Sequence, residues 1–218
     1  MMNSYTMLSL TGFIGTYWPW SILRLDLRYK NFQTYKTLAK YAFKNKEKLM
    51  DVIDAIKTRR SIRKYKDKPV TDEQIKTMLE AAMMAPSAGN AQPWHFIVCR
   101  DKETQVKIKE INPYAAMAEK APLGILVCAD LNLEKFPGYW VQDCSAATQN
   151  ILLSAHGLGL GSVWTGIHPI KEREDGFQKL FNLPEQVIPL AYIVIGYPDQ
   201  EQKTPSRYIP ERVHYDKW

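Results

Sequence analysis

Beyond residue 50 the hydrophobic residues of the chain follow two patterns. In some stretches they recur every three or four positions, which is typical of amphipathic helices, and in others they form short unbroken runs, which are typical of buried strands. The first pattern predicts helices over 51–58, 71–85, 101–111, 139–156 and 171–181. The second predicts strands over 94–99, 123–129, 162–166 and 187–196.

Residues at the ends of these patterns mark where the helices begin and end. Asp51 is placed to cap the first helix, and Thr71 with Gln74 has the spacing of a capping box at the start of the second. Gly157 is expected to stop the long helix that precedes it. The run from Gly157 to Gly161 has the spacing GxGxG, but it follows a helix and precedes a strand. Because a dinucleotide-binding motif has the opposite order, we do not interpret the run as one.

The first 49 residues differ from the rest. Residues 7–23 carry no charge, but glycine, proline and hydroxyl residues make them too polar for a convincing membrane span, and the features of a secretory signal are missing. Residues 24–48 are basic, with apolar residues at roughly helical spacing. Two interpretations stay open: an amphipathic anchor at a membrane surface, or a misassigned extension of a protein that starts at Met50. We favour the second and treat 50–218 as one domain.

Composition places residues 50–218 among ordinary soluble domains. The whole chain is 45% hydrophobic and 24% charged, with a net charge of +6. The excess lies in the first 49 residues, which hold eight Lys or Arg against Asp26 and Glu47, so that 21 basic and 21 acidic residues remain beyond them. A neutral body without basic residues interleaved with aromatic ones argues against nucleic-acid binding. We also expect no membrane contact for this part.

The three cysteines indicate a reducing compartment. Cys99, Cys128 and Cys144 show no CxxC spacing, so we predict neither a disulfide framework nor a zinc or iron–sulfur site. The four histidines show no metal-ligand spacing either. We therefore expect no metal, and a location in the cytoplasm.

Three arginines and a serine lie close together where the first predicted helix ends, at Arg59, Arg60, Ser61 and Arg63. Arginine presents a planar set of donors that matches phosphate oxygens and keeps its charge at physiological pH, and the serine hydroxyl adds a short hydrogen bond. A solvated charged surface is the ordinary alternative for such a cluster. By themselves these residues leave both interpretations open.

A second stretch with chemical content is the loop from Pro86 to Trp94. Its small residues let the backbone come close to a planar ligand, and Asn90 and Gln92 can pair with the donors and acceptors of a heterocycle. Taken alone, the loop could equally be a plain connection. The tail beyond Pro198 is rich in proline, charge and aromatic residues without a helical period, and we expect it to lie on another surface.

Together these stretches resemble the nitroreductase family of FMN-dependent oxidoreductases. The matching segments occur in the family's order and spacing: RRSIRKY at 59–65, PSAGNAQPWHF at 86–96, GLGLGSVWTGI at 157–167, and IGYPDQ at 195–200 followed by Arg207 and VHYDKW. The resemblance covers residues 50–218 and leaves residues 1–49 unexplained.

The resemblance implies an α+β fold in three layers, with helices on both sides of a mixed central sheet. Two chains would intertwine as a homodimer with FMN at the subunit interface, each C-terminal tail wrapping around the partner. Arg59, Ser61 and Arg207 would hold the FMN phosphate with help from Arg60, and Arg63 would reach the N1/O2 edge of the flavin ring. The partner's loop would line the flavin and its ribityl chain, and the end of one strand would approach the ring near N5. The residues concerned are Pro86, Ser87, Ala88 and Asn90 in the loop, and Trp164, Thr165 and Gly166 in the strand.

The resemblance also implies the chemistry. NADH or NADPH would reduce FMN and leave, and a nitroaromatic, quinone or related acceptor would then take the electrons in the same pocket. Such a ping-pong cycle needs no metal, nucleophile or catalytic side chain from the protein, since the flavin carries the redox chemistry. Arg63 would favour the reduced flavin, and His168, which follows the flavin-lining strand, could donate to the substrate.

Two other functions are considered beside this one. The first is a specialised flavin enzyme of the same fold, either a dehalogenase or one that consumes its own flavin, although no long substrate-binding insertion is visible between Ile111 and Trp140. The second is a non-enzymatic anion or nucleic-acid binder, against which the neutral body argues.

Overall fold

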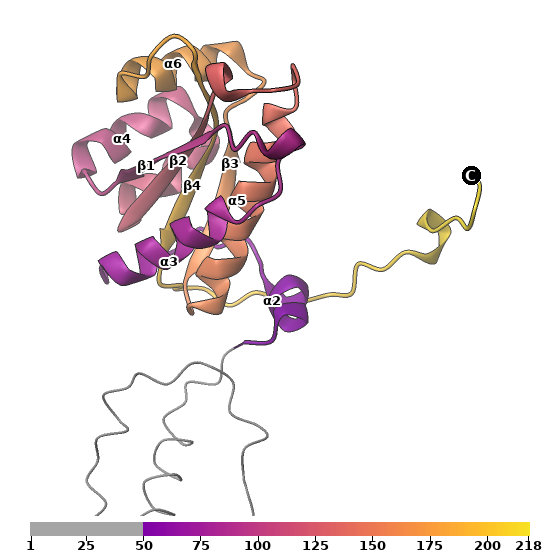
Figure 1. The fold of residues 1–218 in the computed structure, drawn as a ribbon. Coiled ribbons are helices and arrows are strands. Elements are labelled where there is room, and N and C mark those ends of the chain that lie inside the picture. The colour runs from indigo at the N-terminus through magenta and orange to yellow at the C-terminus, as the bar shows by residue number, and fades with distance from the viewer. Residues whose placement is uncertain (1–49) are drawn as a thin grey trace, which may run out of the picture. The chain divides into compact units, whose positions relative to one another are not determined.

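The computed structural model describes residues 50–218, and the interpretations of residues 1–49 lie outside that range. Every helix and strand expected beyond residue 50 is present (Figure 1). The helices are α2 (Val52–Thr58), α3 (Asp72–Met83), α4 (Lys102–Ile111), α5 (Trp140–Gly157) and α6 (Lys171–Phe181). The strands are β1 (Trp94–Cys99), β2 (Leu123–Asp130), β3 (Gly161–Gly166) and β4 (Val187–Gly196). Four short 3-10 turns complete the description: η1 (Ala88–Asn90), η2 (Pro113–Lys120), η3 (Leu131–Leu133) and η4 (Pro210–Arg212).

The strands form one sheet in the order β1-β2-β4-β3, and each neighbouring pair is antiparallel. The expectation of a mixed sheet therefore needs a correction. Within residues 50–218 the parallel pairing is limited to an isolated bridge between Ser61 and Ser162. This bridge joins residues 59–63, the arginine-rich segment, to β3.

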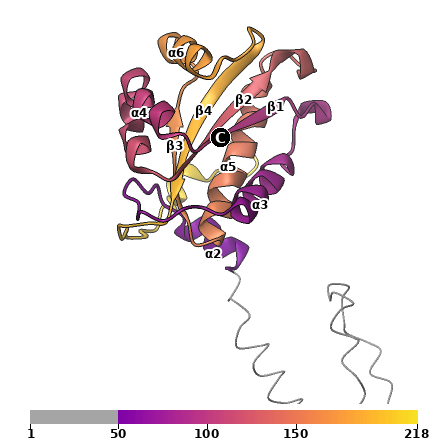
Figure 2. The same cartoon turned by 90° about the vertical axis from the view of Figure 1, so that its left-hand side faces the viewer.

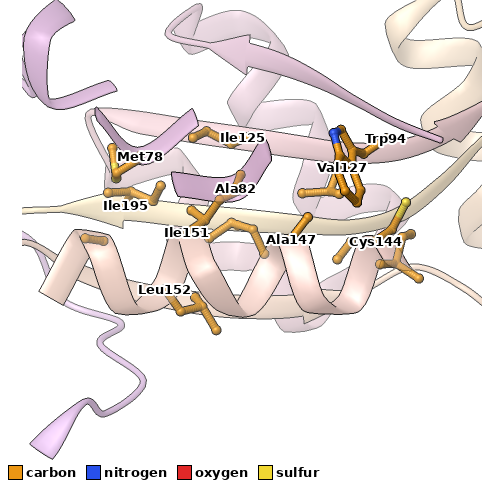
Figure 3. Packing of buried hydrophobic residues seen from close by; sticks show 14 of the residues in the cluster. Met78, Ala82, Trp94, Ile125, Val127, Cys144, Ala147, Ile151, Leu152 and Ile195 are labelled. Carbon is orange, nitrogen blue, oxygen red and sulfur yellow. The ribbon is translucent and has the colours of Figure 1, made fainter. Parts of the chain in front are cut away.

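Helices cover both faces of the sheet and give three layers, which confirms the α+β class (Figure 2). α3 and α5 pack on one face, and α4, η2 and α6 pack on the other. Because successive strand residues point to opposite faces, Ile125 and Val127 of β2 join the core under α5, whereas Leu126 joins the opposite core. Figure 3 labels Ala147 and Ile151 of α5 together with Ile125 and Val127 of β2 in the first of these cores.

Local signals fix most of the helix ends. The capping box at Thr71 and Gln74 is formed in full, and Asp51 accepts hydrogen bonds from the first turn of α2. The predicted end of α5 is one residue short, and the glycine expected to stop the helix is wrong. The helix includes Gly157 and ends where Gly159 takes a left-handed φ of 73°, with the Leu160 amide donating to the Ala155 carbonyl at 2.8 Å. Gly159, and not Gly157, is therefore the glycine that stops the helix.

Among the helices of residues 50–218, none is long and apolar enough to cross a membrane. The tail beyond Pro198 contains the short turn η4, and residues 201–218 are all exposed.

Candidate functional site

Three guanidinium groups gather where α2 ends. Arg59 follows the last residue of α2 and is half-buried, and Arg60 and Arg207 lie close enough to repel it. Burial, together with this repulsion, lowers the pKa of the Arg59 guanidinium from its usual value. Among residues 50–218, no carboxylate forms a salt bridge with any of the three. The cluster therefore carries positive charge that an anion could neutralise.

Arg60 is oriented by its own turn. Its Nη1 donates to the carbonyls of Lys57 and Arg59 at 2.9 and 2.6 Å, so the side chain holds the end of α2 in place. Its Nε is buried without an acceptor in the described part of the chain. A buried donor without a partner is unfavourable, and a bound anion is one means of relieving it.

The segment that carries the cluster is fixed against the sheet. The Ile62 amide donates to the Ser162 carbonyl at 3.0 Å, next to the bridge between Ser61 and Ser162. Gly161 makes this approach possible, because a Cβ built there would lie 2.7 Å from Ile62 Cβ. The last glycine of the GxGxG run thus has a structural role: it lets the segment lie directly on β3.

Residues that follow β4 hold the other side of the same segment. Gln200 Oε1 accepts from the amides of Arg63 and Lys64 at 2.9 Å each, and Gln202 Nε2 donates to the Ser61 carbonyl at 2.7 Å. The backbone of Arg63 is therefore fixed while its side chain stays exposed and free to reach a ligand.

A pocket of about 300 Å³ opens beside the cluster. Its lining comes from the end of α2, the end of α5, the start of β3 and the segment after β4, and includes Arg59, Arg60, His156, Ser162 and Gln200. Four distant parts of the sequence thus meet at one cavity.

β3 runs from this cavity along the edge of the sheet. Beyond the bridge at Ser162, its outer edge has no strand beside it in the described part of the chain. Trp164 is half-buried on the α5 side of the strand, and the Gly166 carbonyl accepts from Asn112 Nδ2 at 3.1 Å and Arg173 Nη1 at 3.0 Å. Thr165 is buried, and its hydroxyl donates to the Tyr192 carbonyl at 2.6 Å, so that hydroxyl is already used within the fold.

The predicted ligand-lining loop lies at the opposite end of α5. η1 contains Ala88, whose amide donates to Asp143 Oδ1 at 2.9 Å, and Lys135 Nζ donates to the Gly89 carbonyl at 2.7 Å. Gly89 and Asn90 both have left-handed backbones, with φ of 56° and 53°, which glycine and asparagine tolerate best. Pro86 and Ser87 precede this turn, and Ser87 Oγ accepts from the Gln92 amide at 3.0 Å.

The length of α5 separates the loop from the arginine cluster. Asp143, which holds the loop, lies thirteen residues before His156, which lies at the cluster. At a rise of about 1.5 Å per residue this is about 20 Å along the helix axis. The structure therefore unites Arg59, Arg60, Ser61 and Arg207, but places the loop of the same chain at a distant position.

Two histidines have defined partners that sequence reasoning did not predict. His168 Nδ1 is 2.7 Å from Glu174 Oε1, and its ring lies edge-on to Trp140 with the centroids 4.7 Å apart. His156 Nε2 is 2.8 Å from Thr58 Oγ1 at the arginine cluster. No local pattern indicates the second contact, because it depends on how the end of α5 packs against the end of α2.

Comparison with known proteins assigns the fold to a family. The sequence profile of the Nitroreductase family matches residues 56–130 and 112–197. The chain belongs to the nitroreductase family. A family member from Methanothermobacter thermautotrophicus named "Putative NADH dehydrogenase/NAD(P)H nitroreductase" is 55% identical over 169 residues, which span 78% of this chain and 88% of that protein.

Two further family members carry more specific descriptions. The "FMN reductase [NAD(P)H]" of Bacillus subtilis is 31% identical over 185 residues, covering 77% of this chain and 74% of that protein. A crystal structure from Desulfovibrio desulfuricans, solved in complex with FMN, is 33% identical with a TM-score of 0.68 and covers 78% of this chain and 98% of that one.

Proposed function

We propose that this nitroreductase-family protein is an FMN-dependent oxidoreductase that takes electrons from NADH or NADPH. The observation that carries the proposal is the cluster of Arg59, Arg60 and Arg207. Arg59 and Arg60 are half-buried, Arg207 is exposed, and none of the three has a carboxylate partner among residues 50–218. Such a cluster suits a phosphate group. FMN has a phosphate, and relatives of this chain are named for FMN or were solved with it.

The residues present fit this cofactor. Arg59 and Arg207 would bind the phosphate with the Ser61 hydroxyl, and Arg60 would add charge while its Nη1 keeps the turn in place. The open edge of β3 would then lie along the rest of the cofactor, so that Trp164 and the backbone of Thr165 and Gly166 approach the ring. When bound, FMN supplies the transfer of hydride and electrons.

Arg63 would act on the redox step. Its exposed side chain starts from a backbone that Gln200 holds fixed, and we place its guanidinium at the N1/O2 edge of the ring. A fixed cation stabilises negative charge that develops there on reduction and needs little reorganisation to do so. Arg63 therefore favours acceptance of electrons from NAD(P)H.

We propose that two chains complete each site. The loop at Pro86–Asn90 is about 20 Å along α5 from the arginine cluster of its own chain. This separation supports the interpretation that the loop reaches the cofactor from a second copy. α2 also exposes apolar side chains that a partner could cover: Val52, Ile53 and Ile56 are between 51% and 64% exposed.

One pocket would serve donor and acceptor in turn. NAD(P)H would enter first and leave, and a nitroaromatic, quinone or related acceptor would follow, which gives a ping-pong pattern. η2, β2 and η3 occupy most of the chain between Ile111 and Trp140, so this region has little room for the insertions expected of a dehalogenase or a flavin-consuming enzyme. The three cysteines are free and buried, which suits the cytosol in which we place the activity.

The test begins with the purified full chain. We expect a yellow protein, or one that becomes yellow with FMN, whose flavin absorbance is bleached anaerobically by NADH or NADPH and restored by a quinone. A colourless protein that FMN cannot reconstitute would contradict the whole proposal. A yellow protein that neither nucleotide bleaches would instead favour the specialised flavin enzyme.

A further inference from the structure

His156 lies at the arginine cluster although it comes from a different element. It occupies the last turn of α5, is half-buried, and lines the same pocket as Thr58, Arg59 and Arg60. Its Nε2 is 2.8 Å from Thr58 Oγ1. The ring therefore shares the cavity that the proposed function assigns to the cofactor phosphate.

The hydrogen bonds at Thr58 define which ring nitrogen can titrate. The Thr58 hydroxyl donates its single proton to the Asp54 carbonyl at 2.6 Å. With the hydroxyl proton assigned to this shorter contact, His156 Nε2 is the donor to Thr58 Oγ1. This bond persists whether the ring is neutral or charged, so gain or loss of charge takes place at Nδ1.

The surroundings of His156 favour the neutral ring while the cluster is without an anion. The pKa of His156 lies below its usual value. Burial is the larger cause, and repulsion by the charges of Arg59 and Arg60 is the smaller one. Thr58, Gln200 and Gln202, which share the pocket, are neutral. Within residues 50–218 no carboxylate pairs with the His156 ring to offset these effects.

A phosphate dianion would reverse this balance. It would place about two negative charges at the arginines that now repel a charged imidazole. We propose that His156 is a further residue of the phosphate site, which takes up a proton at Nδ1 when the phosphate binds and then adds its own positive charge to the cluster. The proposal rests on the proposed function, because it needs a phosphate ligand at this cluster.

The expected pH dependence follows from linkage. A group with a higher pKa in the complex than in the free protein makes binding tighter as the pH falls between those two values, by at most about tenfold per pH unit for one proton. The second pKa of a phosphate monoester is about 6, so the ligand itself stays mostly a dianion above about pH 6.5. Proton uptake between pH 6.5 and 8 would therefore come from the protein.

The test is calorimetric titration of FMN into the full chain from which flavin has been removed. Repeating the titration from pH 6.5 to 8, in buffers with different ionisation enthalpies, gives the number of protons taken up. We expect uptake of a fraction of a proton and an affinity that rises several-fold as the pH falls, both lost in His156→Gln, whose amide can still donate to Thr58. His95→Gln is the matched control, since His95 is exposed on β1. Riboflavin, which lacks the phosphate, should show no uptake.

The possible outcomes separate this inference from the proposed function. Failure of FMN to bind at any pH would refute the proposed function itself. Tight binding with the same proton uptake in the wild type and His156→Gln would overturn the role of His156 alone. If the variant does not fold, NMR titration of the wild-type histidine ring signals decides the matter: the midpoint of His156 should rise on FMN addition, and an unchanged midpoint would overturn the inference.

Discussion

The arginines near the candidate site differ in how the fold holds them, and this difference gives a prediction that separates their roles. Arg207 contributes to the charge at the arginine cluster, whereas Arg63 lies on a backbone that Gln200 holds fixed. Loss of a hydrogen bond to a charged group costs about 1.5–3 kcal/mol. Arg207→Ala should therefore weaken FMN binding roughly ten- to a hundredfold. Arg63→Ala should mainly slow reduction by NAD(P)H.

Two measurements on each variant check this division. Flavin fluorescence titration gives the dissociation constant of FMN, and anaerobic stopped-flow absorbance gives the rate of reduction at saturating NAD(P)H. Arg100→Ala is a suitable control, because Arg100 pairs with Asp72 away from the cluster. Equal effects of Arg63→Ala and Arg207→Ala on both quantities would show that the two arginines share one role.

At this scale the sequence indicates where a site could lie but not the use of each side chain. The chemistry of arginine makes Arg59 to Arg63 a candidate phosphate site without any coordinates, but taken alone it leaves a solvated charged surface equally open. The sequence cannot indicate that Arg60 donates to the carbonyls of its own turn, or that the Thr165 hydroxyl is occupied by Tyr192. Both depend on how the chain folds around the residue, as does the contact of His156 with Thr58.

At the scale of elements, the contact between β3 and the arginine-rich segment depends on Gly161. In Gly161→Ala the new methyl group would lie 2.7–2.8 Å from three carbon atoms of Ile62. Because Ile62 is buried and its amide is bonded to β3, relief would displace the segment that carries the arginines. Overpacking of this kind costs about 1–3 kcal/mol. We expect a lower melting temperature and weaker FMN binding.

Gly157→Ala is the matched control for this prediction. Gly157 is the last residue of α5, and a Cβ there would meet no atom within 4 Å. Alanine also favours the helix by up to about 1 kcal/mol relative to glycine. Thermal unfolding and FMN titration of both variants should thus separate them. If Gly161→Ala matched the wild type in both measurements, the segment would not depend on close contact with β3.

The elements themselves follow closely from the sequence, because hydrophobic periodicity and capping residues act locally. α6 and β4 have the predicted bounds, and Thr71 with Gln74 starts α3 as expected. The sequence predicts that Gly157 stops α5, whereas the left-handed turn that leads into β3 places the stop at Gly159. η2 has no helical or strand pattern and was not predicted.

At the scale of the whole molecule, two motifs that are close in the sequence lie far apart in the folded chain. The loop at Pro86–Asn90 follows the arginine-rich segment by fewer than thirty residues in the sequence, yet α5 holds the two apart by about 20 Å in one chain. Only the resemblance to a dimeric family indicated that the loop would act on the partner's site. The folded chain supplies an independent physical reason for a second copy.

This separation leads to a prediction that links assembly to cofactor binding. α2 presents Ile56, which is 52% exposed, beside Val52 and Ile53 on the surface that we propose the partner covers. A charge placed in a desolvated apolar contact should weaken the dimer by about 2 kcal/mol or more, roughly thirtyfold in its dissociation constant. In Ile56→Lys we expect dissociation to monomers at a protein concentration about thirtyfold higher than in the wild type. These monomers should also bind FMN weakly, because the loop of the second chain is missing.

Sedimentation velocity and FMN titration over the same concentration range would measure both properties. Val106→Lys is the control, because Val106 is an exposed apolar residue on α4, on a different helix from α2. For Ile56→Lys, the fraction of dimer and the affinity for FMN should rise over the same range of protein concentration. A variant that stays monomeric and still binds FMN as tightly as the wild type would show that one chain forms the whole site. The loop at Pro86–Asn90 would then need another role, since its own chain holds it at the far end of α5 from the arginine cluster.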